Sequence, residues 1–248
     1  MCATCGCGGA GVRVSHAGHG HPHGHDRTVT LEVDLLAAND ALARRNRGRL
    51  DRAGIVAVNL MSSPGSGKTT LLERTIRTLG GVSCAVLEGD QETLLDADRI
   101  AATGARAVQI NTGAGCHLDA GMVARGLDAL APEDGSLVFV ENVGNLVCPA
   151  LFALGEHARV VIMSVTEGAD KPLKYPHMFR TADLVVLTKT DLLPHVDFAV
   201  HDWADAVRRA RPGVAILQVS ATTGAGMDEW RAWLEGLRTH HGAPTRTG

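Results

Sequence analysis

The sequence has few aromatic residues, no excess of positive charge and no long apolar run, and each shortage excludes a class of protein. Aromatic residues make up 3% of the 248 residues, so side chains for base stacking are scarce. The formal net charge of -3 argues against a nucleic-acid partner. Apolar runs such as VVIM at 160–163 have the length of a strand and cannot cross a bilayer. We therefore expect neither a nucleic-acid nor a membrane partner.

The first residues also lack the apolar core of a secretion signal. On that ground we expect a cytoplasmic protein. The chain contains 6 cysteines. In the cytoplasm cysteines are poor candidates for disulfides, so metal binding or chemistry is the better explanation for them.

The chain divides into three regions. Residues 1–27 are rich in Cys, His and Gly and have little to bury, which predicts a flexible metal-binding tail. Residues 28–54 form a helical segment, with leucines at helical spacing over about 33–52 and a stop near Gly54. The rest, 55–248, is predicted to be one α/β domain, for which a hydrophobic content of 45% supplies a core.

Short β-branched runs recur through that domain and are separated mostly by segments of helical length. They are apolar throughout, as expected when helices cover both faces of a parallel sheet. This pattern predicts an α/β fold with three layers and a mainly parallel, doubly wound sheet. The predicted strands are 55–61, 83–88, 105–110, 136–141, 159–165, 184–188 and 214–219.

A phosphate-binding loop follows the first predicted strand. The stretch SSPGSGKTT at 62–70 lies between that strand and a predicted helix, which is the context that a P-loop requires. Lys68 can reach the β- and γ-phosphates, and the Thr69 hydroxyl can bind Mg²⁺. The first glycine of the usual pattern is absent, because position 62 is Ser. The residues expected at the phosphates are Ser63, Pro64, Gly65, Ser66, Gly67, Lys68, Thr69 and Thr70.

Guanine is favoured over adenine by the stretch LTKTDLL. Thr188, Lys189 and Asp191 follow a predicted strand, where GTP-binding proteins carry Asn-Lys-x-Asp. The Asp carboxylate accepts two hydrogen bonds from the guanine edge, which adenine cannot donate. Thr188 replaces the usual Asn, which leaves the strength of guanine binding open. Ser220 and Ala221 in SATTGAG are expected to approach the base.

Acidic residues at predicted strand ends complete the site. Asp90 and Glu141 are candidates for holding Mg²⁺ or positioning water, and together with Lys68 they are the predicted catalytic residues. Asp96 is a second candidate, with a helix-capping or surface role as the alternative. No arginine or glutamine can be assigned to hydrolysis from a motif, so a partner or a second copy would complete the site.

Soft metal ligands occur at the N-terminus. Cys2, Cys5 and Cys7 can surround one ion, and with the terminal amine they favour Ni²⁺ over tetrahedral Zn²⁺. The following tract HAGHGHPHGHD suggests storage of Ni²⁺, Zn²⁺ or Cu²⁺.

A second candidate metal site combines Cys116, His117 and Cys148. All three follow predicted parallel strands and therefore belong on the nucleotide-binding edge of the sheet. The alternative for each is an ordinary buried side chain. Cys84 falls within a predicted strand and is assigned to the core.

Together these stretches resemble the HypB family of hydrogenase nickel-incorporation GTPases over nearly the whole chain. The resemblance rests on MCATCGCG, NLMSSPGSGKTTLLE, LEGDQETLLDADRI, NTGAGCHLDA, VENVGNLVCPA, SVTEGADKPLKYPHMFR and LTKTDLLP. It implies GTP hydrolysis, which we expect to be slow because no arginine or glutamine can be assigned to it, and a nucleotide-dependent homodimer. It also implies a tight nickel site at Cys2, Cys5 and Cys7, and a site for nickel or zinc at Cys116, His117 and Cys148 near the dimer interface.

The resemblance also implies partners. A small HypA-type nickel/zinc accessory protein would cooperate in loading nickel into the large subunit of [NiFe] hydrogenase. Gly121 stands where some members carry a further His, which argues against a bridging metal there. Lys171 and Lys174 in ADKPLKYP could reach phosphate across a dimer or lie in solvent. The alternative functions are a nickel store with vestigial nucleotide binding, and a metal-chaperone GTPase for urease or a cobalamin enzyme.

Overall fold

The computed structural model describes residues 25–90, 95–113 and 115–242. The cysteines and histidines predicted to bind metal before residue 25 lie outside this part of the chain. Within the described part the strands are β1 (Val56–Ser62), β2 (Cys84–Asp90), β3 (Arg106–Asn111), β4 (Leu137–Glu141), β5 (Ala158–Ser164), β6 (Leu184–Thr188) and β7 (Ala215–Gln218). Each lies within one or two residues of a predicted strand, so the predicted strands are confirmed.

The helices of the described residues alternate with these strands. They are α1 (His25–Arg52), α2 (Lys68–Thr78), α3 (Leu95–Ala101), α4 (Ala120–Leu130), α5 (Lys171–Lys174), α6 (Pro176–Arg180), α7 (Val200–Ala210) and α8 (Met227–His241), with short 3-10 helices η1 (Cys148–Ala150) and η2 (Thr190–His195). The predicted helix at about 33–52 is confirmed, and it begins earlier, at His25. None of the helices in these described ranges is long and apolar enough to cross a membrane.

The seven strands form one sheet in the order β3-β2-β4-β1-β5-β6-β7, and all neighbouring pairs are parallel. The predicted doubly wound sheet is thus confirmed, and it is wholly parallel rather than mainly so. From central β1 the chain moves to one side for β2 and β3. It returns to β4 and crosses to β5 on the other side of β1. Loops after β1, β4 and β5 therefore meet at the carboxyl edge, where such sheets bind ligands.

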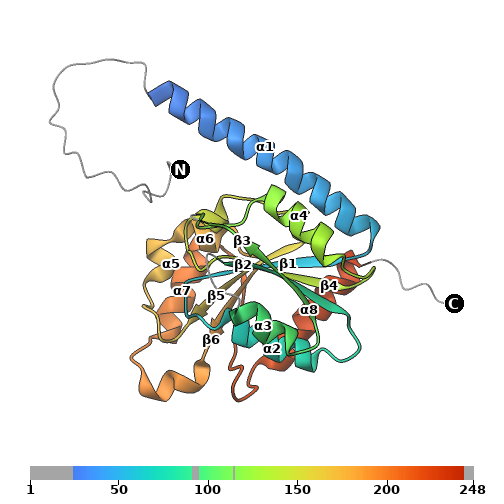
Figure 1. Cartoon of the computed structure of the whole chain (residues 1–248). Coiled ribbons are helices and arrows are strands. Elements are labelled where there is room, and N and C mark those ends of the chain that lie inside the picture. Colours follow the sequence, from blue (N-terminus) through green and yellow to red (C-terminus); the bar gives the residue numbers. More distant parts are fainter. Residues whose placement is uncertain (1–24, 91–94, 114, 243–248) are drawn as a thin grey trace, which may run out of the picture.

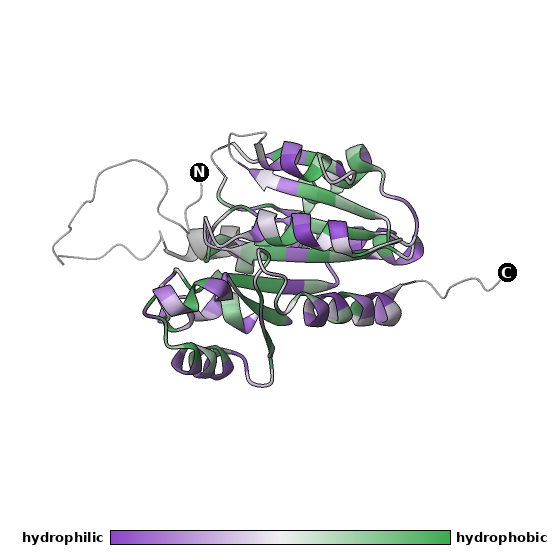
Figure 2. Cartoon of the chain, turned by 90° about the horizontal axis from the view of Figure 1, so that it is seen from below, coloured by the Kyte–Doolittle hydropathy of each residue, from purple (hydrophilic) through white to green (hydrophobic). Residues whose placement is uncertain are grey.

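Side chains that alternate along β1 divide the core between the two faces of the sheet. Leu60 packs in a cluster with residues of α2 and α8, whereas Met61 packs in a cluster with residues of α6 and α7. On the same face as Met61, Ala57 packs with residues of α1 and α4. The sheet is therefore a middle layer between two helical layers, and its strands are largely apolar (Figures 1 and 2). This is the predicted three-layer arrangement.

The long helix α1 lies across α4 (Figure 1). Two buried asparagines fix it there. Asn39 donates to the Ala153 carbonyl and accepts from the Ala120 N–H, and Asn46 donates to the Ala120 and Leu154 carbonyls. Buried amides need such partners, so these bonds fix the register of α1 on the domain.

Candidate functional site

The P-loop connects β1 to α2 and forms one wall of a cavity of about 490 Å³. Gly65 and Gly67 have φ angles of 73° and 90°, a left-handed conformation that suits glycine and turns backbone N–H groups toward the cavity. Helix α2 begins at Lys68, so its positive N-terminal end faces the same space. This loop is suited to hold the phosphates of a nucleotide.

Ser62, the departure from the usual glycine, has a structural explanation. Its buried hydroxyl accepts hydrogen bonds from Lys68 Nζ at 2.8 Å and from Ser66 Oγ at 2.6 Å, and donates to the Ser63 carbonyl. The serine therefore holds the ammonium group over the loop. Burial lowers the pKa of Lys68, and the nearby Glu141 carboxylate opposes that shift.

Two carboxylates lie side by side at the end of the sheet. Glu141 ends β4 and pairs in register with Glu88 of β2, and both side chains are buried. Glu141 Oε1 accepts a hydrogen bond from the Thr69 hydroxyl at 2.8 Å, while one oxygen of each carboxylate has no hydrogen-bond partner. Burial raises the pKa of Glu141, and burial together with Glu141, Asp96 and Asp90 raises that of Glu88 to about 8. An acidic pair of this kind is suited to a cation.

Four acidic or basic residues of the cavity bear on the sequence predictions. Asp90, at the end of β2, lines the cavity as expected. Asp96 also lines it and accepts from Arg99 at 3.0 Å. Glu88 and Arg99 line the cavity as well, and neither was predicted from the sequence. Glu88 falls inside a strand pattern, and Arg99 has the appearance of a solvent-facing helical residue.

The predicted guanine segment lies next to the P-loop. The Thr188 hydroxyl donates to the Ser66 carbonyl at 2.6 Å, and Lys189 Nζ donates to the Gly65 carbonyl at 2.7 Å. Ser220 Oγ donates to Asp191 Oδ1 at 2.6 Å, which brings the loop containing Ala221 beside Asp191. Thr188, which replaces the usual Asn, thus connects the predicted guanine segment to the phosphate loop.

Lys171 also contacts the P-loop, within the same chain. Its Nζ donates to the Ser63 hydroxyl and to Glu167 Oε2, both at 2.8 Å. The interpretation of Lys171 as a solvated residue is wrong, because it is held at the phosphate loop. Lys174 is exposed and pairs with Asp170, as expected for a solvated side chain.

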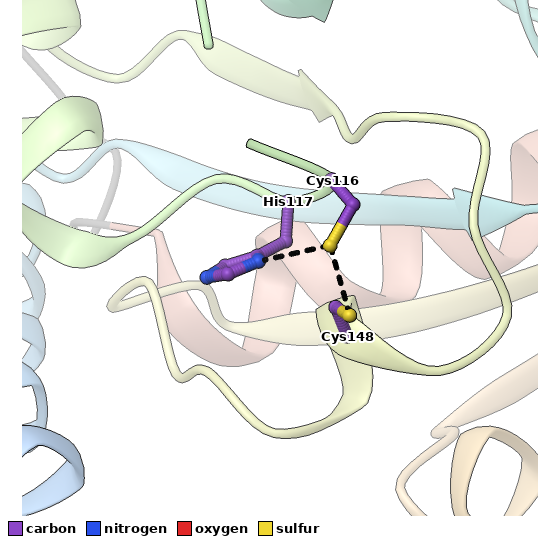
Figure 3. Close-up of side chains that lie close together, drawn as sticks. All are labelled: Cys116, His117 and Cys148. Atoms are coloured by element: carbon purple, nitrogen blue, oxygen red, sulfur yellow. Dashed lines mark hydrogen bonds between the residues drawn. The ribbon is translucent and has the colours of Figure 1, made fainter. Parts of the chain in front are cut away.

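The second candidate metal site is assembled from two loops at the same edge of the sheet (Figure 3). The sulfur atoms of Cys116 and Cys148 lie 2.9 Å apart, and His117 Nδ1 lies 3.7 Å from the Cys116 sulfur. The ligand atoms of all three residues lie within 4.8 Å of one another, and no other group of three or more Cys, His, Asp or Glu in the described ranges meets this criterion. Burial lowers the pKa of His117, which favours the neutral imidazole that binds metal. The set of two thiols and one imidazole is suited to a soft or borderline ion.

The surroundings of this cluster hold its ligands in place. The His117 ring stacks on Phe152 with centroids 4.0 Å apart, and both Cys116 and Cys148 are buried.

Two other residues discussed in the sequence analysis lie outside the cluster. Gly121 lies in α4, where an added Cβ would come within 3.7 Å of Leu42. By contrast, Cys84 packs beside the core and lies outside the cluster, and burial raises its pKa to about 11.

Comparison with known proteins now defines the class of protein. Residues 56–218 match the family described as the CobW/HypB/UreG nucleotide-binding domain. Together with the P-loop and the parallel sheet, this match makes the chain a P-loop nucleotide-binding protein of that class.

Closer relatives narrow the assignment. The hydrogenase maturation factor HypB of Azotobacter chroococcum is 57% identical over 213 residues, covering 86% of this chain and 70% of the relative. A solved structure of HypB from Archaeoglobus fulgidus matches with a TM-score of 0.77 and 42% identity, covering 82% of this chain and all of that one. HypB from Helicobacter pylori, solved in complex with nickel, matches with a TM-score of 0.77 and 37% identity over 85% of this chain and all of that one. The chain belongs to the HypB family of hydrogenase maturation factors.

Proposed function

We propose that this protein is a GTP-hydrolysing nickel metallochaperone, in which the bound nucleotide controls how tightly a metal is held at Cys116, His117 and Cys148. The observation that carries the proposal is the course of one segment, residues 141–148. It begins at Glu141, which contacts the P-loop, and ends at Cys148, which belongs to the thiol cluster.

The segment is in contact with the P-loop along its first half. Glu141 accepts from Thr69, and Gly144 approaches Pro64 so closely that an added Cβ would lie 3.0 Å from its Cα. A phosphate that reshapes the loop would therefore displace this segment. Since binding energies of linked sites are reciprocal, a metal at Cys148 would in turn alter nucleotide affinity.

The other loop of the thiol cluster is connected to the ends of β2 and β4. Thr112 donates its backbone N–H to the Asp90 carbonyl at 3.0 Å, and the Leu118 N–H donates to Asn142 Oδ1 at 3.1 Å. The side chain of Leu118 packs on Gly89, where an added Cβ would come within 2.7 Å of it. Both loops of the thiol cluster are thus fixed to residues that line the nucleotide cavity.

Mg²⁺ fits the acidic end of the same cavity. Thr69 and Glu141 would hold it, with Asp90 as a further oxygen ligand, and the unpartnered buried oxygen of Glu141 supports this assignment. The ion would neutralise phosphate charge when bound. Lys68 would bind the β- and γ-phosphates, and Lys171 would hold the loop through Ser63.

GTP is the proposed nucleotide because of Asp191. Its carboxylate would accept from the N1–H and N2–H₂ groups of guanine, and the Ser220 hydroxyl holds it in position. Lys189 and Ala221 would flank the base.

Nickel is the proposed cargo, and the cluster could also hold zinc. A HypB relative from Helicobacter pylori has been solved with nickel, which supports a nickel role in this chain. We further propose that Cys2, Cys5 and Cys7 form a separate tight nickel site in a tail of residues 1–27. That tail would precede a helical segment, 28–54, and a GTPase domain, 55–248. A HypA-type accessory protein, the large subunit of [NiFe] hydrogenase and a second copy of the chain are the proposed partners.

Turnover of GTP by the full chain tests the activity, with ATP as the competing substrate and Lys68→Ala as the control. We expect slow hydrolysis of GTP, little of ATP, and none above background in the control. Equal rates for wild type and Lys68→Ala would contradict a GTPase and leave the nickel store as the remaining function.

A further inference from the structure

A guanidinium group lies at the rim of the nucleotide cavity. Arg99 of α3 lines the cavity, and it is the one arginine among the described residues that do so. Its Nη2 lies 3.3 Å from the hydroxyl of Thr70, the residue that follows the proposed Mg²⁺ ligand Thr69. The guanidinium therefore contacts the last residue of the phosphate-binding stretch 62–70.

Two carboxylates hold Arg99 in this position. Nη2 donates to Glu73 Oε2 at 2.8 Å, and Nη1 donates to Asp96 Oδ1 at 3.0 Å. The Arg99 side chain is 43% exposed, so these ion pairs are partly screened by water. Pairs of this kind contribute little stability, and a more highly charged partner can replace them at small cost.

A bound nucleotide would supply that partner. A triphosphate carries up to four negative charges, and the described cavity wall already contains carboxylates that repel them. The carboxylates are Glu88, Asp90, Asp96 and Glu141, against the cations Lys68, Lys189 and Arg99. Lys68 would already bind the β- and γ-phosphates, and Lys189 donates to the Gly65 carbonyl. Arg99 remains as the planar, bidentate donor that matches phosphoryl oxygens.

We propose that Arg99 is a catalytic residue that leaves Glu73 and contacts the γ-phosphoryl group of GTP during hydrolysis. The inference rests on the proposed GTPase function and deepens it. In the reaction the water oxygen forms a bond to the γ-phosphorus, and the bond from that phosphorus to the β–γ bridging oxygen breaks. The bridging oxygen keeps the electron pair and becomes an oxygen of GDP. One proton of the water stays on the phosphate product, and the other passes to solvent. Arg99 forms no covalent bond and stabilises the charge that builds up on the transferred group.

Three variants of the full chain test this role. Arg99→Ala should lower kcat for GTP by about 10³-fold, the lower end of the effect of arginines that contact the transferred phosphoryl group, and should leave the Kd of GDP within about threefold. Arg99→Lys should recover only a small part of the rate, because an ammonium lacks the bidentate geometry. Glu73→Gln removes the ion pair between Glu73 and Arg99 but keeps the Arg99 side chain, which is then free to contact the phosphoryl group. The kcat of this variant should therefore equal or exceed that of wild type.

The opposite results overturn the proposal. An unchanged kcat in Arg99→Ala removes any role in hydrolysis. If kcat fell as far in Glu73→Gln as in Arg99→Ala, hydrolysis would depend on the ion pair that connects α2 and α3, and not on a contact between Arg99 and the phosphoryl group. A second readout is independent of turnover: Arg99→Ala should weaken binding of GDP with aluminium fluoride at least tenfold relative to GDP alone. Failure of wild type to hydrolyse GTP would contradict the proposed function, while the fluoride complex would still decide whether Arg99 contacts the phosphoryl position.

Discussion

The side chain of Asn142 joins the nucleotide cavity to the thiol cluster by accepting a hydrogen bond from the backbone N–H of Leu118 at 3.1 Å. Asn142 directly follows Glu141, and Leu118 directly follows His117. The same carbonyl oxygen accepts from the Val143 N–H, and the amide nitrogen donates to Asn59 Oδ1 at 3.3 Å. Because this amide is buried and its partners come from the middle of β1, the segment after β4 and the loop before α4, it cannot move without disturbing both sites.

Replacement of Asn142 should uncouple the two sites. In Asn142→Ala we expect the Kd of Ni²⁺ at the cluster to be the same with GDP and with a non-hydrolysable GTP analogue. We also expect a loss of about 1–3 kcal/mol in the free energy of unfolding, because buried N–H groups lose their acceptor. Nickel titrations in both nucleotide states measure the first effect, and urea unfolding measures the second.

Thr75→Val is the matched control for that loss of stability. The Thr75 hydroxyl accepts from Trp230 Nε1 at 2.8 Å in another part of the core, so its loss should destabilise the fold without touching Asn142. A control that loses its coupling as completely as Asn142→Ala would refute the role given to Asn142.

The thiol cluster should lose nickel when either cysteine is removed. Cys116→Ala and Cys148→Ala should abolish thiolate-to-nickel absorption from this site in a chain that starts at residue 28, whereas His117→Ala should weaken binding. Cys84→Ser should bind nickel as the unsubstituted chain does, because burial raises the pKa of Cys84 to about 11 and the residue lies outside the cluster. Equal nickel binding by Cys84→Ser and Cys116→Ala would exclude the cluster as the site.

Asp191 should determine the choice of base. In Asp191→Asn the side chain can no longer accept two hydrogen bonds from guanine, so we expect the Kd of GTP to rise at least 10²-fold. The Asn amide can donate to the O2 of xanthine, so the variant should bind xanthosine triphosphate more tightly than wild type does. Competition against a fluorescent nucleotide measures both affinities. Unchanged preference for GTP would mean that other residues recognise the base.

His157 should make stability depend on pH. Its Nδ1 accepts from the Ala57 N–H at 3.0 Å, and its Nε2 lies 2.9 Å from Asp51 Oδ1. These two contacts connect the end of α1 to β1. Burial, followed by Arg47, lowers the pKa of His157 below 6.5, although Asp51 opposes the shift. The unfolded chain therefore binds this proton first as pH falls. Stability should be complete above about pH 6.5 and should decline below it, by at most about 1.4 kcal/mol per pH unit.

Unfolding of His157→Asn by urea between pH 5 and 7.5 isolates this contribution. The Asn carbonyl can still accept from Ala57 but does not titrate, so the variant should be less stable at pH 7 and should lose less stability on acidification. Parallel pH profiles for variant and wild type would show that another group is responsible.

The strands and motifs could be predicted because each depends on local sequence. Continuous β-branched runs marked the strands, and the P-loop pattern lies between β1 and α2 as expected. Glu88 was missed because its importance comes from sheet order: β2 pairs with β4 rather than β1, which places Glu88 beside Glu141. Asn142 was missed for a similar reason, since its partner Leu118 is 24 residues away. Long-range pairing of this kind leaves no periodic signal in the sequence.

The central claim is that the nucleotide controls metal affinity, and the most direct test is the Kd of Ni²⁺ in a chain starting at residue 28. It should be measured once with GDP and once with a non-hydrolysable GTP analogue, both with Mg²⁺. The connection of Glu141, Asn142 and Cys148 predicts a difference of about 5–150-fold, which is typical of coupled sites. Identical affinities in the two nucleotide states would contradict the claim.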